Sequence, residues 1–434
     1  MAEQREDSMS RTIIRDCRVW DGSGKAAFPA DLLIEGGRIR AVARNRGQLD
    51  GAGAEVIEAG GMTLMPGLVE GHAHLSFGNA VATTDLGDLP PEEHTLLTAR
   101  NAKTLLDHGF TSAYSAASAK LRLDIVIRNA IAAGQIPGPR LKACGPEITV
   151  TGGLGDERSA HMYRESFAVI ADGPAEIVKW ARLCCREGAD SIKLNVSGDN
   201  LYKAAQAEMT VMSEAEIRAG VEVARDFHRK VNCHCRAAES VKRAVRCGVD
   251  VIYHCEHADT EAFDLLEGEK HRVFVGPAIG LPYSMRESLT ALNTAADPKL
   301  RELVERSLAA AVRTYEQMRK RGIRVVIGGD YGFDMTPQGT NARDIEHFVK
   351  LFGYSPSEAL ACATRIGAEL MDMGHELGQI REGYLADLLL VDGDPLADVS
   401  ILQRQERLVA IMQNGNFHKL DRNALARRQG RTAE

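Results

Sequence analysis

A His-x-His pair is the strongest local indication of chemistry in this sequence. His72 and His74 follow a short apolar run over 63–69 that reads as a strand. In an extended segment, residues i and i+2 point the same way, so both imidazoles can reach one metal ion. Taken alone, the pair could equally be two histidines of a core.

Other polar residues lie at or near the ends of separate strand-like runs, and they strengthen this interpretation. They are Lys193, His234, His254 and Asp330, the last of them in Gly328-Gly329-Asp330. Barrel enzymes place their catalytic groups at the carboxyl ends of their strands. A shared metal centre is the simplest common reason for polar residues at these positions, and it is our hypothesis.

The elements that must position these residues form a repeating β-then-α pattern. Strand-like runs cover 63–69, 110–114, 140–144, 191–196, 230–234, 249–254, 272–275 and 323–327. Helical patterns, with apolar residues three and four apart, cover 175–187, 214–228 and 303–321. This repeat is typical of a parallel sheet, and eight units predict an α/β fold of the (β/α)8 TIM-barrel type. A doubly wound open sheet fits the periodicity as well; the placement of the polar residues favours the barrel.

The two ends of the chain have a different texture, with short apolar runs separated by tight turns such as Glu35-Gly36-Gly37 and Asn414-Gly415-Asn416. Because chain ends often lie close together, we predict that they form one small β-sandwich domain. Its parts are 1–65, with 1–10 as a flexible tail, and 376–422. The barrel then covers 66–375, and 423–434 is a second tail.

Composition narrows the class of protein. A net charge of −7 with interspersed signs argues against nucleic-acid or anionic-membrane partners. The sequence shows neither a run of the roughly 20 apolar residues that span a bilayer nor a secretory signal. The nine scattered cysteines predict reduced thiols and a cytoplasmic location. Cys233-x-Cys235 and Cys255 could suggest thiolate ligands, but their spacing lacks the usual knuckle.

Two longer motifs resemble the amidohydrolase superfamily. They are Met65-Pro66-Gly67-Leu68-Val69-Glu70-Gly71-His72-Ala73-His74 and the late segment from Gly378 to Val391, followed by Asp394-Pro395-Leu396. The resemblance covers roughly residues 11 to 420. Within the superfamily, 152–156, 188–193 and 234–254 are similar to the branch of prolidase-like dipeptidases and related amide, carbamate and phenylurea hydrolases.

The resemblance implies two divalent metal ions, usually zinc. His72, His74 and Asp330 would hold one ion, His234 and His254 the other, and Lys193 would bridge them after N6-carboxylation. An unmodified ammonium repels cations, whereas a carbamate is anionic and can bridge two of them. Metal-activated hydroxide, with Asp330 as general base, would then cleave a C–N bond beside a carbonyl. The resemblance also implies a homo-oligomer that acts on a small molecule.

The substrate contacts are less defined. His257 competes with His254 for the ligand role and otherwise becomes a substrate contact. Where related dipeptidases carry a His, this chain has Leu154. Further substrate-binding candidates are Arg236, Tyr331 and His161. Arg236 could clasp a substrate carboxylate or be a solvated residue at a helix start. We expect the substrate to be an N-acyl amino acid, dipeptide, aryl amide, carbamate or urea.

Two rival classes deserve weight. A non-hydrolytic relative, such as a decarboxylase or isomerase, is expected to lose one metal ion or the bridging lysine. A catalytically inactive binding protein should lack at least one ligand. Lys193, Asp330 and the four histidines are all present, which favours the hydrolase.

Overall fold

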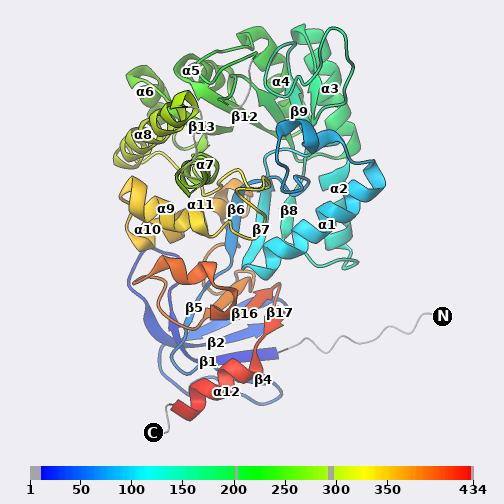
Figure 1. The fold of residues 1–434 in the computed structure, drawn as a ribbon. Helices are drawn as coiled ribbons and strands as arrows, with labels where there is room; N and C mark the ends of the chain where they lie inside the picture. The colour runs from blue at the N-terminus through cyan, green and yellow to red at the C-terminus, as the bar shows by residue number, and fades with distance from the viewer. Residues whose placement is uncertain (1–10, 201–203, 292–297, 432–434) are drawn as a thin grey trace, which may run out of the picture. The chain divides into compact units, whose positions relative to one another are not determined.

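The computed structural model describes residues 11–200, 204–291 and 298–431 (Figure 1). The described chain divides into two compact units. The first unit contains 11–69, 106–111 and 355–431, and the second contains 70–105 and the described residues of 112–354. Within the described ranges, no helix combines the length and the apolar character needed to cross a membrane. The predicted tail 1–10 lies outside the described residues.

The first unit is built on an eight-stranded sheet to which both ends of the chain contribute. Its strand order is β17-β16-β15-β5-β1-β2-β3, and β4 pairs with β1. The strands are β1 (Arg11–Val19), β2 (Phe28–Glu35), β3 (Arg38–Ala43), β4 (Glu55–Glu58), β5 (Thr63–Pro66), β15 (Leu388–Val391), β16 (Leu408–Gln413) and β17 (Asn416–Leu420). Strands β5 and β15 run antiparallel, with Pro66 opposite Leu388.

A tight turn and one apolar core shape this sheet. Gly36 and Gly37 join β2 to β3 with φ values of 59° and 76°, which is the left-handed backbone that a two-residue hairpin requires. Buried side chains of both chain ends, such as Leu64 and Leu390, belong to one hydrophobic cluster. Burial of this shared apolar surface is what holds the two ends together.

Short helices complete the first unit. They are α10 (Pro356–Cys362), α11 (Arg365–Leu370), α12 (Arg422–Arg431), η2 (Val399–Gln403) and η3 (Gln405–Arg407). Helix α12 occupies most of 423–434, where the sequence predicted a tail. The difference has a physical reason, because Leu425 is 6% exposed and packs into the hydrophobic cluster of the sheet.

In the second unit, strands alternate with helices as the repeat predicted. The strands are β6 (Leu68–Ala73), β7 (Phe110–Ser115), β8 (Arg140–Lys142), β9 (Cys144–Thr149), β10 (Ala168–Ile170), β11 (Ser191–Asn195), β12 (Lys230–Ala237), β13 (Val251–His257) and β14 (Phe274–Gly276). The helices are η1 (Thr83–Gly87), α1 (Pro91–Asp107), α2 (Leu123–Ala132), α3 (Gly173–Glu187), α4 (Glu214–Asp226), α5 (Ala238–Cys247), α6 (Thr260–Gly268), α7 (Gly280–Ala291), α8 (Pro298–Lys320) and α9 (Arg343–Phe352). Helices α4, α5 and α8 pack on β12 and β13 (Figure 1).

These strands form two sheets. One has the order β10-β9-β11-β12-β13-β14 and the other β6-β7-β8. All the recorded pairings of the larger sheet are parallel. The predicted strand 323–327 is not continuous: it makes a single parallel bridge between Val325 and Val275. It nevertheless runs on to Gly71, whose N–H donates to the Ile327 carbonyl at 3.0 Å.

The same Gly-x-Asp sequence precedes two strands, β11 and β13, and sets their register against the neighbouring strand. Gly188 and Gly248 end α3 and α5 in the left-handed conformation, with φ of 100° and 92°. Asp190 then donates its N–H to the Ala143 carbonyl and accepts the Ala143 N–H. Asp250 makes the same two bonds with Val231. Hydrogen bonds to the neighbouring strand thereby fix β11 and β13 a few residues before Lys193 and His254, respectively.

Candidate metal centre

The side chains of His72, His74, Lys193, His234, His254 and Asp330 line one cavity of about 40 Å³. His72 lies in β6 and His74 directly follows that strand. Lys193, His234 and His254 lie in β11, β12 and β13, and Asp330 follows the segment 323–327. Parallel pairing aligns three of these elements, with Asn195 opposite His234 and Cys235 opposite His254. The structure therefore brings together all the metal ligands that the sequence predicted.

One half of the cavity contains His72, His74 and Asp330. The Oδ1 atom of Asp330 lies 3.3 Å from Nε2 of His74 and 4.0 Å from Nε2 of His72. On its other side, the His74 ring uses Nδ1 to contact the Ala117 carbonyl at 3.1 Å. This contact orients Nε2 toward the cavity, as expected of a ligating imidazole. Nδ1 of His72 is buried without a hydrogen-bond partner.

The other half contains His234 and His254, whose ring centroids are 4.1 Å apart. A ligand atom of His254 lies within 4.8 Å of ligand atoms of both His72 and Asp330, so these three could hold one ion. His257 instead lines a separate groove with Phe263 and Arg313. The structure thus brings His254, and not His257, to the cavity.

Two of the residues in the cavity adopt a left-handed backbone. The φ values are 75° at His254 and 62° at Asp330. Residues other than glycine rarely adopt this conformation, and such strain concentrates at functional sites. At His254 the Tyr315 hydroxyl donates to the backbone carbonyl at 2.8 Å, and beside Asp330 the Gly328 N–H donates to Asp344.

Lys193 is 1% exposed and has an unusual environment for an ammonium group. Within the described part of the chain, no anion forms an ion pair with its Nζ atom, which lies 4.9 Å from the centroid of the Tyr253 ring. Burial of an unpaired charge is costly. An unmodified Lys193 would moreover share its cavity with four imidazoles. Of the side chains of the site, it is therefore the one whose charge is least stabilised by its protein neighbours.

Burial keeps three of the imidazoles neutral. It lowers the pKa of His234 to about 4, and it lowers the pKa values of His72 and His254 well below the ordinary value of 6.5. Burial alone would raise the pKa of Asp330, but the His74 hydrogen bond and the electrostatic interactions with its polar neighbours, Lys193 among them, lower it well below the usual range. At neutral pH these three imidazoles are therefore neutral and Asp330 is a carboxylate, the protonation states that bind metal ions.

A buried network holds the turn that carries Asp330. Asp344 is 0% exposed, and its carboxylate accepts the Gly328 N–H at 3.1 Å and the Tyr331 hydroxyl at 3.0 Å. Its Oδ1 atom also lies 3.3 Å from Nδ1 of His347. These contacts hold the chain on both sides of Asp330, through the backbone of Gly328 and the side chain of Tyr331. The hydroxyl of Tyr331, which was predicted as a substrate contact, is thus already hydrogen-bonded to Asp344.

A second acid supports His72. Glu70 accepts the His72 N–H at 3.0 Å and an amide N–H of Asn341 at 2.9 Å. Burial, followed by repulsion from Asp344, raises the pKa of Glu70 to about 8. Glu70 belongs to the motif around His72, but its type alone gave no sign of this role.

Arg236, another predicted substrate contact, lies in a buried ion cluster. Its Nε atom donates to Asp199 at 2.7 Å, and Nη1 donates to Glu256. Glu256 also accepts the Ser307 hydroxyl at 3.3 Å. This geometry excludes a solvated helix-start position for Arg236, which is 5% exposed, and it shows that two carboxylates already engage the guanidinium.

The remaining candidates separate clearly. Leu154 lines the metal cavity, whereas His161 is exposed on a loop and does not. Glu147 and Asp199 also line the cavity and were missed by the sequence analysis. Asp199 follows the Lys193 strand in Ser197-Gly198-Asp199, a position after a strand end that could have indicated it.

All nine cysteines are free and buried, and burial raises the pKa of Cys233 and Cys255 well above 9, which disfavours thiolate ligands.

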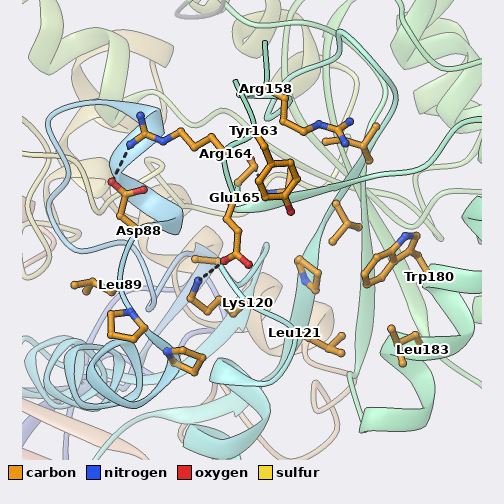
Figure 2. A pocket seen from close by; sticks show the side chains of 18 residues that line it. Asp88, Leu89, Lys120, Leu121, Arg158, Tyr163, Arg164, Glu165, Trp180 and Leu183 are labelled. Atoms are coloured by element: carbon orange, nitrogen blue, oxygen red, sulfur yellow. Dashed lines mark hydrogen bonds and ion pairs between the residues drawn. The ribbon is translucent and has the colours of Figure 1, made fainter. Parts of the chain in front are cut away.

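A larger pocket, of about 720 Å³, lies elsewhere in the second unit and contains none of the predicted ligands (Figure 2). Its charged side chains pair with one another: Arg164 contacts Asp88 at 2.8 Å and Lys120 contacts Glu165 at 3.7 Å. Trp180 and Tyr163 form part of its wall. With its charges neutralised and no candidate nucleophile or metal ligand set, this pocket does not compete with the metal cavity for the chemistry.

Comparison with known proteins agrees with the geometry. The model of the Amidohydrolase family matches residues 63–417. Ochratoxinase of Aspergillus niger is 26% identical over 378 residues, which cover 82% of this chain and 75% of that protein. The crystal structure of an amidohydrolase is 28% identical, with a TM-score of 0.85 over 95% of this chain and 99% of the other. A Xaa-Pro dipeptidase with bound methionine is 26% identical, with a TM-score of 0.80 over 94% and 100% of the two chains.

The class defined by the fold and the cavity is that of barrel hydrolases with an additional domain. The chain belongs to the amidohydrolase family, in the branch of prolidase-like and related amide hydrolases. It is a hydrolase that acts on carbon–nitrogen bonds. Members of this family use a metal centre, and the His72, His254 and Asp330 cluster provides a place for one.

Proposed function

We propose that this protein is a binuclear metal hydrolase that cleaves an amide-type C–N bond in a small molecule, with Asp330 as general base. The observation that carries the proposal is Lys193, a buried lysine without an anionic partner in the described chain, set among four imidazoles and a carboxylate. Carboxylation of Nζ would remove the unfavourable ammonium and create an anionic bridge between two cations.

The residues present fit two divalent ions, and zinc suits a set of imidazole and carboxylate donors. His72, His74 and Asp330 would hold one ion, His234 and His254 the other, and carboxylated Lys193 would bridge them. The unpartnered Nδ1 of His72 and the ring of His74, oriented from its far side, both support this use of the imidazoles. When bound, the ions would supply an acidified water and a Lewis acid for the substrate carbonyl.

Proton transfer is then the task of Asp330. Its carboxylate stays ionised at neutral pH and can accept a proton from the attacking water. As the C–N bond breaks, the same carboxyl group donates that proton to the leaving nitrogen, which departs as a neutral amine. The hydrogen bonds of Asp344 with the Gly328 N–H and the Tyr331 hydroxyl would keep Asp330 in place through both transfers.

We also propose the finer architecture. Hydrogen bonds of Val275 with the Arg324 carbonyl and of Gly71 with the Ile327 carbonyl support closure of the two parallel sheets into one (β/α)8 barrel. A fold of the eight-stranded sheet into a β-sandwich is likewise part of the proposal. The oligomeric state and the cytoplasmic location stay predictions of the sequence.

The test combines metal analysis with a substrate screen. We expect the purified protein to contain about two divalent ions per chain and to hydrolyse members of a panel of dipeptides, N-acyl amino acids, aryl amides, carbamates and ureas. Lys193→Ala should lose metal and activity together, and short carboxylic acids should restore part of both. Lys179→Ala, at an exposed lysine on α3, is the matched control. A folded Lys193→Ala protein with full metal content and activity would refute the proposal.

A further inference from the structure

The walls of the metal cavity beyond the proposed ligands are mostly hydrocarbon. Six apolar side chains form them: Phe77, Leu86, Leu154, Phe167, Leu281 and Phe333. None of these is more than 8% exposed. Five of them, all except Leu154, belong to one packed apolar cluster. A substrate group that enters the cavity therefore exchanges water for apolar contacts, which favours an apolar or aromatic group.

The charged residues of the same walls are acidic. Glu147 accepts a hydrogen bond from Nδ2 of Asn195 at 2.5 Å, and Asp199 binds Arg236. Lys193 is assigned to the metal bridge by the proposed function. Apart from it, no lysine or arginine lines this cavity within the ranges that the structure describes. Within those ranges, the protein side chains of the walls thus include no lysine or arginine, other than Lys193, that could pair with a substrate carboxylate.

Arg236, two residues after His234, does not fill this gap. Its guanidinium is shared between the carboxylates of Asp199 and Glu256, and all three side chains are buried. The guanidinium thus already faces two carboxylates, and a third carboxylate beside it would bring a further negative charge into a region of low dielectric constant.

Leu281 is the wall residue with the clearest influence on substrate size. It lines the metal cavity, and it also lines a neighbouring cavity whose walls include Pro282, Met285, Leu303 and Val304. The side chain therefore separates the metal cavity from this second space, whose walls also include Asp199 and the ion-paired Arg236. Its volume decides whether an apolar group bound at the metals can extend into the second space.

From these observations we propose that the enzyme prefers amide-type substrates that carry an apolar or aromatic group, that it discriminates against a carboxylate next to the scissile bond, and that Leu281 limits the size of the group. This inference rests on the proposed function and narrows it. Dipeptides and N-acyl amino acids become poor substrates, whereas aryl amides and other uncharged amides become good ones.

The test uses two amides that differ by one carboxylate: N-benzoyl phenethylamine and N-benzoyl phenylalanine. With the zinc-loaded protein we expect kcat/KM to be about 100-fold higher for the phenethylamine amide, because an unpaired carboxylate loses its hydration. An equal or higher value for N-benzoyl phenylalanine overturns the inference and leaves the proposed function standing, since a C–N bond is still cleaved. Absence of turnover with both amides also overturns the inference. The metal content and the wider panel of substrates then decide whether the proposed function holds.

A wall variant sharpens the result. Leu281→Arg places a cation beside the scissile bond and should lower the preference for the uncharged amide at least about tenfold. Leu281→Met, which conserves volume, should keep the wild-type preference. If Leu281→Arg folds, as judged by circular dichroism, and its preference is unchanged, the assignment of Leu281 is wrong. If it does not fold, the wild-type ratio and Leu281→Ala, which should accept larger apolar groups, decide the matter.

Discussion

The two halves of the candidate metal centre are held in place by different physics. Around Asp330, support comes from hydrogen bonds of Asp344 to the backbone and to Tyr331. Around His234, the Nε2 atom contacts the Gly198 carbonyl at 3.0 Å, and the neighbouring support is the buried ion pair of Asp199 with Arg236. One half thus depends on the geometry of a turn, and the other on a balance of buried charges. The two should therefore fail in different ways when mutated.

The largest expected effect is on chemistry in the Asp330 half. Asp330→Asn keeps the shape of the side chain but removes the base, so kcat should fall about 1,000-fold while the fold is retained. Steady-state kinetics and the thermal midpoint measure the two quantities. Asp334→Asn, at an exposed aspartate four residues on, should behave as wild type. Near-normal turnover of Asp330→Asn would remove Asp330 from its role.

In the His234 half, the dominant effect should be on stability. Arg236→Met leaves the carboxylates of Asp199 and Glu256 buried without their cation and should cost about 3–5 kcal/mol of unfolding free energy. Chemical denaturation of the metal-free protein measures it. Arg246→Met breaks an exposed ion pair with Glu261 and should cost less than about 1 kcal/mol. Equal losses in the two variants would contradict the comparison.

A smaller effect is expected from the support of the Asp330 turn. Asp344→Asn should lower kcat by about 10- to 100-fold, because the amide cannot accept the same set of hydrogen bonds, and should change KM little. Tyr331→Phe removes one of those bonds and should fall between this variant and wild type. A change in KM alone, with kcat preserved, would mean that Asp344 shapes substrate binding rather than the position of Asp330.

The last prediction concerns the pH dependence of stability, and its residue does not line the metal cavity. Burial raises the pKa of Asp124 to about 7, above its usual 3.8. The folded state therefore favours the neutral acid, and the resulting stability is full below pH 3.8 and is lost as pH rises toward 7. Asp124→Asn should remove up to about 1.4 kcal/mol per pH unit of this dependence. Denaturation midpoints of both proteins across that range measure it; parallel curves would refute the assignment.

The sequence predicted the alternation of strands and helices, and the residues that line one cavity, because both depend on local patterns. Apolar runs and helix periodicity are short-range features. The order of polar residues at strand ends then followed from the geometry of parallel sheets. The family resemblance added the bridging role of Lys193, which its residue type alone would not indicate.

What the sequence could not predict depends on long-range contacts. Asp344 reaches Gly328 across sixteen positions, and Arg236 finds Glu256 twenty positions away, with nothing local to mark either pair. The run 323–327 was expected as a full strand and makes one bridge, since it passes beside Gly71, where a Cβ atom would lie 2.7 Å from the Ile327 carbonyl oxygen. Helix α12 was missed because one buried leucine gives little periodic signal.

The pairing of β5 with β15 has a consequence for biosynthesis. Strand β5 ends one residue before the strand that leads to His72, and Gly67 between them donates its N–H to the Asp387 carbonyl. During translation, this edge of β5 has no partner until residue 391 has left the ribosome. Sequence separations of this size slow folding. Nascent chains that stall before β15 should therefore be sensitive to proteases between β5 and β6, the strand that contains His72. This sensitivity should persist long after β6 itself has been synthesised.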